Sequence, residues 1–270
     1  MTTPSAPLTA GNARVKQARK LSRRSERSER RLFLADGPKA VEAALDVEGC
    51  VVEVFATLEA TQRYSEWHGC VPAWTVVEDR ALASLSDSVT PAGVVAVCRF
   101  LDVPLASVLE HVEATSRVDL IAICADVRDP GNAGTVIRTA DAAGADVVVL
   151  AGSSVDLYNP KTVRASVGSL FHLPVVVEPG VRTAIDAARA AGLTILAADG
   201  HGEVSLDAAA DILSRPTAWL FGNEARGLAP EIATLADHRV RIPIHGRAES
   251  LNLATASALC LYASASAHRR

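Results

Sequence analysis

The sequence contains few aromatic residues and no long apolar run. Phe, Trp and Tyr make up 4% of its 270 residues, so stacking on many unpaired nucleotide bases is not expected. No apolar run approaches the roughly 18 residues that a membrane-spanning helix needs. The first ten residues lack the basic and then apolar layout of a secretion signal. We therefore expect a cytoplasmic protein without a membrane segment.

Cysteine is sparse and poorly spaced for metal binding. Zinc sites need cysteine pairs a few residues apart, whereas no cysteine here lies within four residues of another. The number of cysteines is odd, and three of them sit inside apolar runs. We expect small buried residues in a reducing compartment, and no metal site. The cysteines are Cys50, Cys70, Cys98, Cys124 and Cys260.

Phosphate-loop signatures are also missing. Gly131 and Gly134 do not complete the dinucleotide fingerprint, and no Walker A string occurs. These absences disfavour a nucleotide-dependent or NAD-dependent enzyme that acts on a small molecule.

Charge is divided unevenly along the chain. Residues 1–40 hold ten Lys or Arg against three acids, a balance of +7, and the remainder holds seventeen against twenty-eight, a balance of −11. A basic leader on an acidic body favours contact with nucleic-acid phosphates. The alternative is a solvated helix with ion pairs such as Glu26–Arg30. The cations expected to contact nucleic-acid phosphates are Arg14, Lys16, Arg19, Lys20, Arg23, Arg24, Arg27, Arg30 and Arg31.

Apolar runs and turn signals divide the chain into two α/β regions. The leader is a polar helical candidate from residue 13 onward, with Val15, Ala18 and Leu21 as its few apolar anchors. Residues 1–12 are expected to be disordered. The predicted parts are a basic arm at 1–31, a small α/β domain at 32–101, a linker at 102–117 and a larger α/β domain at 118–270.

The larger region predicts a mainly parallel sheet with helices on both faces, because continuous apolar strands alternate with helices. Strands are expected at residues 118–125, 146–151, 174–177, 193–198, 217–221 and 239–243. Helices are expected at residues 132–143, 160–170, 181–191, 229–236 and 250–267.

Three polar strings follow apolar strands in the larger region. Residues 128–141 read RDPGNAGTVIRTAD, residues 222–227 read GNEARG, and residues 242–254 read IPIHGRAESLNLA. Ligands of open α/β sheets settle at the carboxyl ends of the strands. A glycine such as Gly222 at such an end lets a ligand approach the backbone closely.

Taken singly, each polar residue of these strings has an ordinary explanation. Asn132 and Ser250 are both natural helix caps. Arg138 is explained equally well as a surface cation, and Glu224 as a solvated loop carboxylate. The three strings carry more weight together than apart.

Together the strings resemble the three motifs of the SpoU (TrmH) branch of the SPOUT RNA methyltransferases. Motif 1 resembles NAGTVIRTA, motif 2 resembles GNEARG, and motif 3 resembles IPI followed by ESLNLA, so the match covers residues 118–267. Residues 16–44, with RSER and LFLADGPKAVEA, resemble the RNA substrate-binding domain that often precedes the catalytic domain and is similar to ribosomal protein L30e. Thiostrepton-resistance rRNA methyltransferases have a similar length and layout.

The resemblance implies an α/β chain in which an L30e-like domain precedes a SPOUT domain with a deep trefoil knot. It implies a homodimer that uses S-adenosylmethionine to methylate a ribose 2′-hydroxyl, with ribosomal RNA favoured and tRNA as the alternative. A non-catalytic RNA-binding or ribosome-assembly protein of the same fold is a further alternative. Carried over by position, the backbone of Gly222, Ile242 and Leu251 would hold the cofactor. The polar catalytic site would consist of Asn132, Arg138, Glu224, Ser250 and Asn252.

The resemblance assigns the activation of the hydroxyl to Arg138. A guanidinium seldom gives up its proton, so we expect Arg138 instead to fix a phosphate and stabilise the developing alkoxide. Glu224 would orient Arg138 or receive the proton through water. Ser250 and Asn252 would position the ribose and shape the loop.

Overall fold

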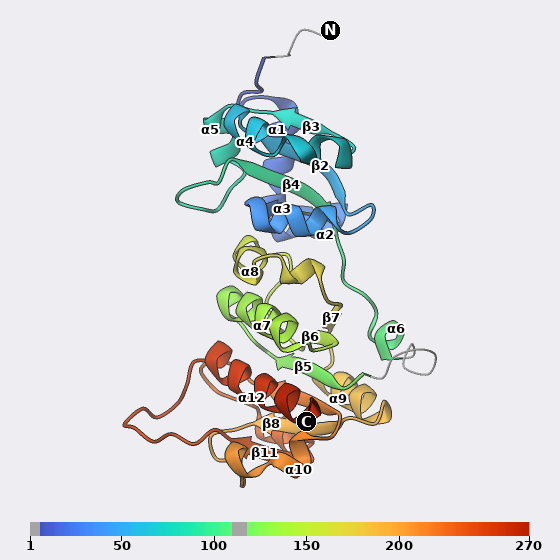
Figure 1. Ribbon diagram of the computed structural model, residues 1–270, viewed down its shortest axis with the longest axis vertical. Helices are drawn as coiled ribbons and strands as arrows, with labels where there is room; N and C mark the ends of the chain where they lie inside the picture. The colour runs from blue at the N-terminus through green and yellow to red at the C-terminus, as the bar shows by residue number, and fades with distance from the viewer. Residues whose placement is uncertain (1–5, 110–117, 270) are drawn as a thin grey trace. The chain divides into compact units, whose positions relative to one another are not determined.

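The computed structural model describes residues 6–109 and 118–269. The chain forms two compact units, one made of Met1–Leu101 with Tyr158–Phe171 and the other of Asp102–Leu157 with His172–Arg270. Figure 1 shows the elements of both units. No helix among the described residues combines the length and apolar content that crossing a membrane requires.

The smaller unit contains a four-stranded sheet in the order β1-β4-β2-β3. Strands β1 and β2 both pair antiparallel with β4, and β3 pairs parallel with β2. The strands are β1 (Leu32–Asp36), β2 (Val51–Ala56), β3 (Trp74–Val76) and β4 (Val94–Arg99). Helices between them are α3 (Pro38–Leu45), α4 (Leu58–Arg63), the 3₁₀ helix η2 (Ser65–Cys70) and α5 (Asp79–Ala83). The predicted strand and helix alternation is confirmed.

The leader is packed into the smaller unit. The three predicted anchors, Val15, Ala18 and Leu21, are fully or almost fully buried in its core. Residues 6–12 were expected to be disordered and are not, because the Leu8 amide donates to Val76 O. The expected single helix is instead α1 (Ala13–Arg19), the 3₁₀ helix η1 (Lys20–Ser22) and α2 (Arg24–Arg30).

Arg27 is the residue that joins the two leader helices. Its guanidinium donates to the carbonyl oxygens of Leu21 and Ser22 at 2.9 and 2.8 Å, and the residue is 3% exposed. The prediction that Arg27 faces RNA is therefore wrong. Its guanidinium donates to backbone carbonyls at the end of the preceding 3₁₀ turn, which have no partner within that turn.

Residues 158–171 belong to the smaller unit, although they lie within the sequence of the larger predicted domain. They form α8 (Pro160–Ser166) and the 3₁₀ helix η4 (Ser169–Phe171), and α8 packs against β1. The Tyr158 ring lies 4.6 Å from that of Phe33 and 3.8 Å from that of Phe100, measured between centroids. Aromatic packing thus attaches this excursion to the small sheet.

The larger unit contains a seven-stranded sheet in which every recorded pairing is parallel, in the order β7-β6-β5-β10-β8-β11-β9. The predicted mainly parallel sheet is confirmed. Its strands are β5 (Leu120–Ala125), β6 (Val147–Ala151), β7 (Val175–Glu178), β8 (Thr194–Ala198), β9 (Val204–Ser205), β10 (Thr217–Phe221) and β11 (His238–Arg241). Strand β9 was not predicted, because two residues are too short to give a periodic signal.

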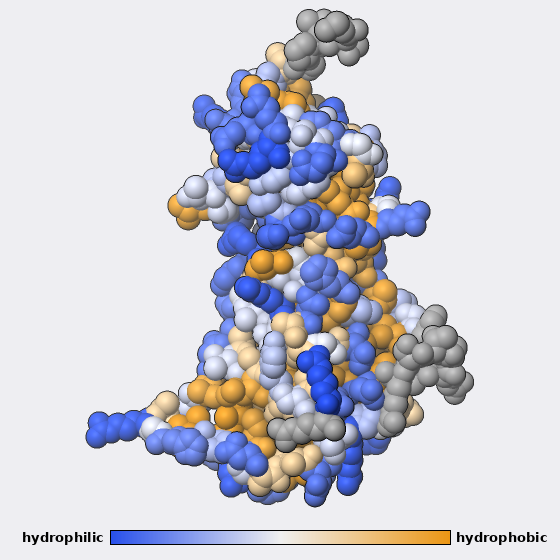
Figure 2. All heavy atoms as spheres, viewed as in Figure 1, coloured by the Kyte–Doolittle hydropathy of each residue, from blue (hydrophilic) through white to orange (hydrophobic). Residues whose placement is uncertain are grey.

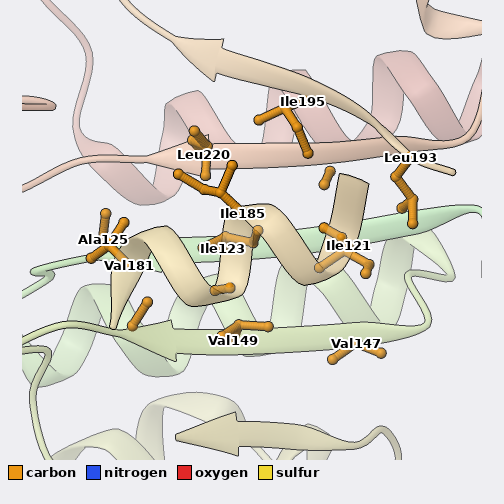
Figure 3. Packing of buried hydrophobic residues seen from close by; sticks show 14 of the residues in the cluster. Ile121, Ile123, Ala125, Val147, Val149, Val181, Ile185, Leu193, Ile195 and Leu220 are labelled. Carbon is orange, nitrogen blue, oxygen red and sulfur yellow. The ribbon is translucent and has the colours of Figure 1, made fainter. Parts of the chain in front are cut away.

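Helix α9 (Val181–Ala190) covers one face of the parallel sheet. Figure 3 shows Val181 and Ile185 of this helix against Ile123, Val149 and Leu220 of the strands, all buried. Removal of these apolar side chains from water is the main favourable contribution to packing the helix on the sheet.

Helix α12 (Leu253–His268) is fixed to the sheet and to α7 (Pro130–Ala143). Its buried Ser264 hydroxyl lies 2.9 Å from Trp219 Nε1 and 3.1 Å from Thr217 Oγ1, both on β10. These bonds satisfy the indole N–H, which would be costly to bury alone. The shorter helices are η5 (Leu206–Ala208), α10 (Ala210–Leu213) and α11 (Pro230–Ala233).

The first half of the predicted linker is part of the larger unit. It forms α6 (Leu105–Leu109), and Val103, Leu105 and Val108 pack against the core that contains α9. Residues 110–117 of the predicted linker lie outside the described residues. Four of the five cysteines are buried, as expected, and Cys70 is exposed.

Candidate functional site

The first motif begins at the turn between β5 and α7. Asp129 caps α7, because its Oδ1 accepts the Asn132 amide at 2.8 Å, and Pro130 follows in the first turn. The cap interpretation of Asn132 is therefore wrong. Asp129 precedes the position that proline favours, and its carboxylate satisfies an amide that the helix start leaves open. The Asn132 side chain remains available for other contacts.

Glu224 connects the second motif to the first. Its carboxylate accepts the backbone amides of Arg128 at 3.1 Å and Asp129 at 2.9 Å, and the Asn132 side-chain amide at 3.3 Å. Burial raises the pKa of Glu224, but the two backbone amides and Asn132 outweigh it, so the pKa is lowered overall. Glu224 is thus an ionised acceptor with three donors, and its oxygens make no bond to Arg138 within the described residues.

Asn132 also contacts the third motif. Its Oδ1 accepts the Asn252 side-chain amide at 3.2 Å. Asn252 in turn caps α12, because its Oδ1 accepts the amides of Ala254 at 2.8 Å and Thr255 at 3.4 Å. The expectation that Ser250 caps the final helix is therefore wrong. The helix begins at Leu253, two residues beyond the first possible position, because Asn252 is the residue that reaches both amides.

Gly222 is buried at the end of β10. A Cβ placed there would lie 2.3 Å from the carbonyl carbon of Gly227 and 2.4 Å from Leu228 N. The close approach that requires glycine is therefore made by the chain's own backbone, which folds back over Gly222. Gly227 has φ of 67°, a left-handed conformation that favours glycine.

Residues 242–252 form an exposed segment between β11 and α12, visible in Figure 1 as a projecting loop of the larger unit. No hydrogen bond joins the backbone of residues 242–251 to any described residue. Leu251 and Ile244 are 36% and 38% exposed. Open amides and carbonyls beside apolar side chains suit a ligand with an adenine ring and an amino-acid tail. Ser250 lies in the same segment, without a side-chain hydrogen bond to the described residues.

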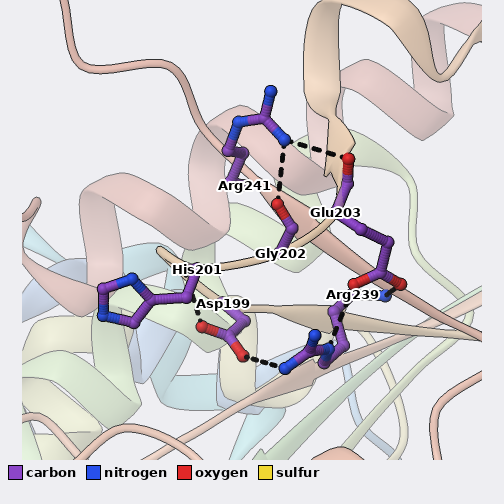
Figure 4. A network of polar contacts seen from close by, with 6 residues as sticks. All are labelled: Asp199, His201, Gly202, Glu203, Arg239 and Arg241. Carbon is purple, nitrogen blue, oxygen red and sulfur yellow. Dashed lines mark hydrogen bonds and ion pairs between the residues drawn. The ribbon is translucent and has the colours of Figure 1, made fainter.

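An arginine pair fixes the place where this segment begins. Arg241 Nη1 donates to the carbonyls of Gly202 at 2.9 Å and Glu203 at 3.0 Å, and Arg239 Nε lies 3.1 Å from the Glu203 carboxylate (Figure 4). The Arg239 backbone amide lowers the pKa of Glu203. The partners of both arginines follow β8 in the chain and could not be identified from the sequence.

Arg138 is exposed on α7 and makes no hydrogen bond or ion pair with the described residues. The structure therefore brings together Asn132, Glu224 and Asn252, and it leaves Arg138 and Ser250 outside their hydrogen-bond network. Among residues 6–109 and 118–269, no three His, Cys, Asp or Glu side chains are placed to hold a metal ion.

Comparison with known proteins identifies the family. The sequence model of the SpoU rRNA Methylase family matches residues 119–262, and that of the MRM3-like substrate binding domain matches residues 12–96. The RlmP protein of Bacillus subtilis, a 23S rRNA (guanosine(2553)-2'-O)-methyltransferase by name, is 34% identical over 254 residues, which cover 94% of this chain and 96% of that protein.

Solved structures agree with the sequence matches. The SpoU methyltransferase AviRb from Streptomyces viridochromogenes has a TM-score of 0.82 and 31% identity, with 96% of this chain and 98% of that chain covered. An AdoMet-bound rRNA methyltransferase from Sinorhizobium meliloti has a TM-score of 0.81 and 32% identity, with 94% of each chain covered.

The protein belongs to the SpoU rRNA methylase family. The predicted class of enzyme, an S-adenosylmethionine-dependent RNA 2′-O-ribose methyltransferase with a SPOUT domain and an N-terminal substrate-binding domain, is thereby confirmed.

Proposed function

We propose that this protein methylates a ribose 2′-hydroxyl of ribosomal RNA. The observation that carries the proposal is the set of hydrogen bonds by which Glu224 and Asn132 join all three motifs at one edge of the sheet. RlmP, which is similar over nearly its whole length, is named for this reaction on 23S rRNA. A ribosomal substrate would also place the enzyme in the cytoplasm.

The polar residues divide into those that hold the site and two, Arg138 and Ser250, that are available to contact the substrate. One group positions the motifs. Asn132 binds Glu224, Glu224 also accepts the Asp129 amide at the start of α7, and Asn252 caps α12. Arg138 makes no hydrogen bond or ion pair with the described residues. Its guanidinium is suited to hold a phosphate bidentately and to stabilise negative charge on the attacking oxygen. Ser250 is exposed and suited to contact the ribose.

The exposed segment 242–252 and the strand end at Gly222 would hold the cofactor. Bound S-adenosylmethionine supplies an electrophilic methyl group. The backbone near Ile242 and Leu251 would bind it, because these amides and carbonyls have no partners among the described residues. The chain's remaining task is to align the hydroxyl with the methyl group and to assist the loss of its proton.

A homodimer is supported by α12. This helix is apolar nearly all round, and such helices are usually buried on every side. One face packs on the sheet, yet Leu259 and Tyr262 are 45% and 48% exposed, and Figure 2 shows hydrophobic atoms gathered over this helix. Light scattering should give about twice the 28.3 kDa of one chain. A monomer mass at micromolar concentration would contradict the proposal.

Exposed leader cations would supply sequence-independent affinity for RNA. Lys16, Arg19, Lys20, Arg23 and Arg24 are exposed and have no partner among the described residues. Arg14 is paired with Glu53 at 2.6 Å, Arg30 donates to Gln17 O, and Arg31 lies over the Phe100 ring. The five unpaired cations are therefore the best candidates for phosphate contacts.

Replacing these five cations with Gln should weaken RNA binding and its dependence on salt. Each lost phosphate contact reduces the slope of log affinity against log salt by roughly 0.7 to 0.9, so we expect a reduction of about 2 or more. Deleting residues 1–31 is not a suitable test, since it would remove the buried Val15, Ala18 and Leu21. Filter binding across a salt series measures the slope. An unchanged slope would assign these charges to solubility.

The proposed reaction is tested with purified protein, methyl-labelled S-adenosylmethionine, and ribosomal RNA or tRNA as acceptors. We expect label in ribosomal RNA at a single 2′-O-methylated nucleotide, located by mapping RNA from cells with and without the gene. Label in tRNA alone would overturn the choice of substrate. No label in any RNA would favour a binding protein of the same fold.

A further inference from the structure

Asn223 lies between two residues that the resemblance assigns to the cofactor and to the catalytic site, yet it received no role itself. Its side chain is half-buried and uses all of its polar atoms. The amide Nδ2 donates to Asp126 O at 3.0 Å, and Oδ1 accepts the amides of Ala225 at 3.0 Å and Arg226 at 3.2 Å. One asparagine therefore shapes its own loop and reaches a residue 97 positions earlier in the chain.

Asp126 is the residue where β5 turns toward α7, and its backbone is left-handed, with φ of 58°. Such a conformation is uncommon outside glycine and persists where the surroundings fix it. Three bonds fix it here: the Asp126 amide donates to Ala151 O, its Oδ1 accepts the Ser153 amide at 2.7 Å, and its carbonyl accepts Asn223. Gly152 is itself left-handed, with φ of 69°, which favours glycine, and a Cβ there would lie 2.7 Å from Asp126 Oδ1.

The neighbouring Glu224 holds the same turn from its other end. It binds the amides of Arg128 and Asp129, while Asn223 binds the carbonyl of Asp126. Two consecutive residues of the second motif thus bind the same turn, Glu224 through its two amides and Asn223 through its carbonyl. The helix that follows this turn carries Asn132 and Arg138, so any shift of the turn displaces both.

We propose that Asn223 is a positioning residue for methyl transfer, acting through the Asp126 turn on the placement of α7. The inference rests on the proposed function, because it assumes that residues on α7 act on the substrate. Asn223 does not itself touch the reacting atoms. Its donor at Nδ2 is the group that matters, since an acceptor facing the Asp126 carbonyl would repel it.

Asn223→Asp separates the donor from the shape of the side chain. The carboxylate keeps the acceptor for Ala225 and Arg226 but loses the donor to Asp126. We expect kcat to fall about 10-fold or more near pH 8, with KM for RNA and the Kd for the cofactor within about three-fold, because small displacements of reacting groups cost that much.

Three comparisons make the test specific. Asn223→Ser keeps a short acceptor without reaching Asp126, so its kcat should fall as in Asn223→Asp although it introduces no charge. Asn159→Asp is the matched control, because Asn159 caps α8 only as an acceptor of the Lys161 amide, and its activity should be unchanged. Melting temperatures of each variant show whether the fold is retained.

An unchanged kcat in folded Asn223→Asp and Asn223→Ser would overturn the inference, as would a loss of activity that comes entirely from a higher KM for RNA or a higher Kd for the cofactor. Hydrogen exchange of the Arg128 and Asp129 amides gives a readout independent of RNA. Faster exchange in Asn223→Asp would show that Asn223 holds the Asp126 turn in place. That result would stand even if the wild-type protein methylates no RNA, in which case only the proposed function fails. Equal exchange in the two proteins would show that Asn223 does not hold this turn in place and would overturn the inference.

Discussion

Arg138→Ala should abolish methylation of RNA and leave the affinity for S-adenosylmethionine within a few-fold. Arg138 is exposed, has no partner among the described residues, and lies six residues after Asn132 on α7, about 9 Å along the helix axis. Loss of one charge-stabilising donor costs about 100-fold or more in kcat.

Two variants control for charge and for geometry. Arg182→Ala removes an exposed cation from α9 that likewise has no partner among the described residues, and we expect its activity to be unchanged. Arg138→Lys keeps the charge but loses the planar fork, so its kcat should lie between those of the wild type and Arg138→Ala. Single-turnover kinetics and calorimetry measure the two quantities. Equal loss of cofactor affinity in Arg138→Ala would refute this division of labour.

Five of the seven strands of the larger unit were predictable because each is a nearly continuous apolar run. These five, such as β10 at Thr217–Phe221, begin and end within two residues of expectation. Strand β11 was also expected, but it ends two residues early because Pro243 lies beyond it. Burial on both faces leaves little choice of residue in such strands, so composition alone identifies them. The order β5-β10-β8-β11, which brings the motif-bearing strands near one another, has no local signal.

Helix caps were the weak point of the sequence analysis. Asn, Asp and Ser cap helices about equally well, so local rules could not choose Asp129 over Asn132 or Asn252 over Ser250. The choice depends on contacts across the chain. Asn132 is recruited by Glu224, 92 residues later, and by Asn252, 120 residues later. Patterns of local spacing cannot detect contacts between residues so far apart in the sequence, and for the same reason no role could be assigned to Asn223 from the sequence.

The sequence correctly shows that positive charge is concentrated in the leader, but it does not show which of these cations face RNA. Nine cations were expected to face RNA, and Arg27 is instead buried against carbonyls of the preceding turn. A sequence reports where charges occur but not which of them the fold consumes. Arg14, Arg30 and Arg31 are also engaged, which leaves a smaller set for the phosphates than the composition suggested.

Gly222→Ala should be the most damaging single substitution at the cofactor side of the site. The added methyl group would lie 2.3 to 2.5 Å from backbone atoms of Gly227 and Leu228, which cannot rotate away as a side chain would. Overpacking of this kind costs roughly 1 to 3 kcal/mol or more, and the backbone must move to relieve it. That movement would displace the loop that carries Asn223 and Glu224. We therefore expect a lower melting temperature and activity reduced about 100-fold.

The glycine at 222 offers a sharper contrast with Arg138 than a second polar residue would. Cofactor affinity should fall together with activity in Gly222→Ala, because the substitution moves the strand end itself, whereas Arg138→Ala should spare it. Gly69→Ala is the matched control, since a Cβ at Gly69 meets no atom within 4 Å and the backbone there is not left-handed. Calorimetry on all three variants decides the matter. Wild-type cofactor affinity in Gly222→Ala would mean that this strand end is not part of the cofactor site.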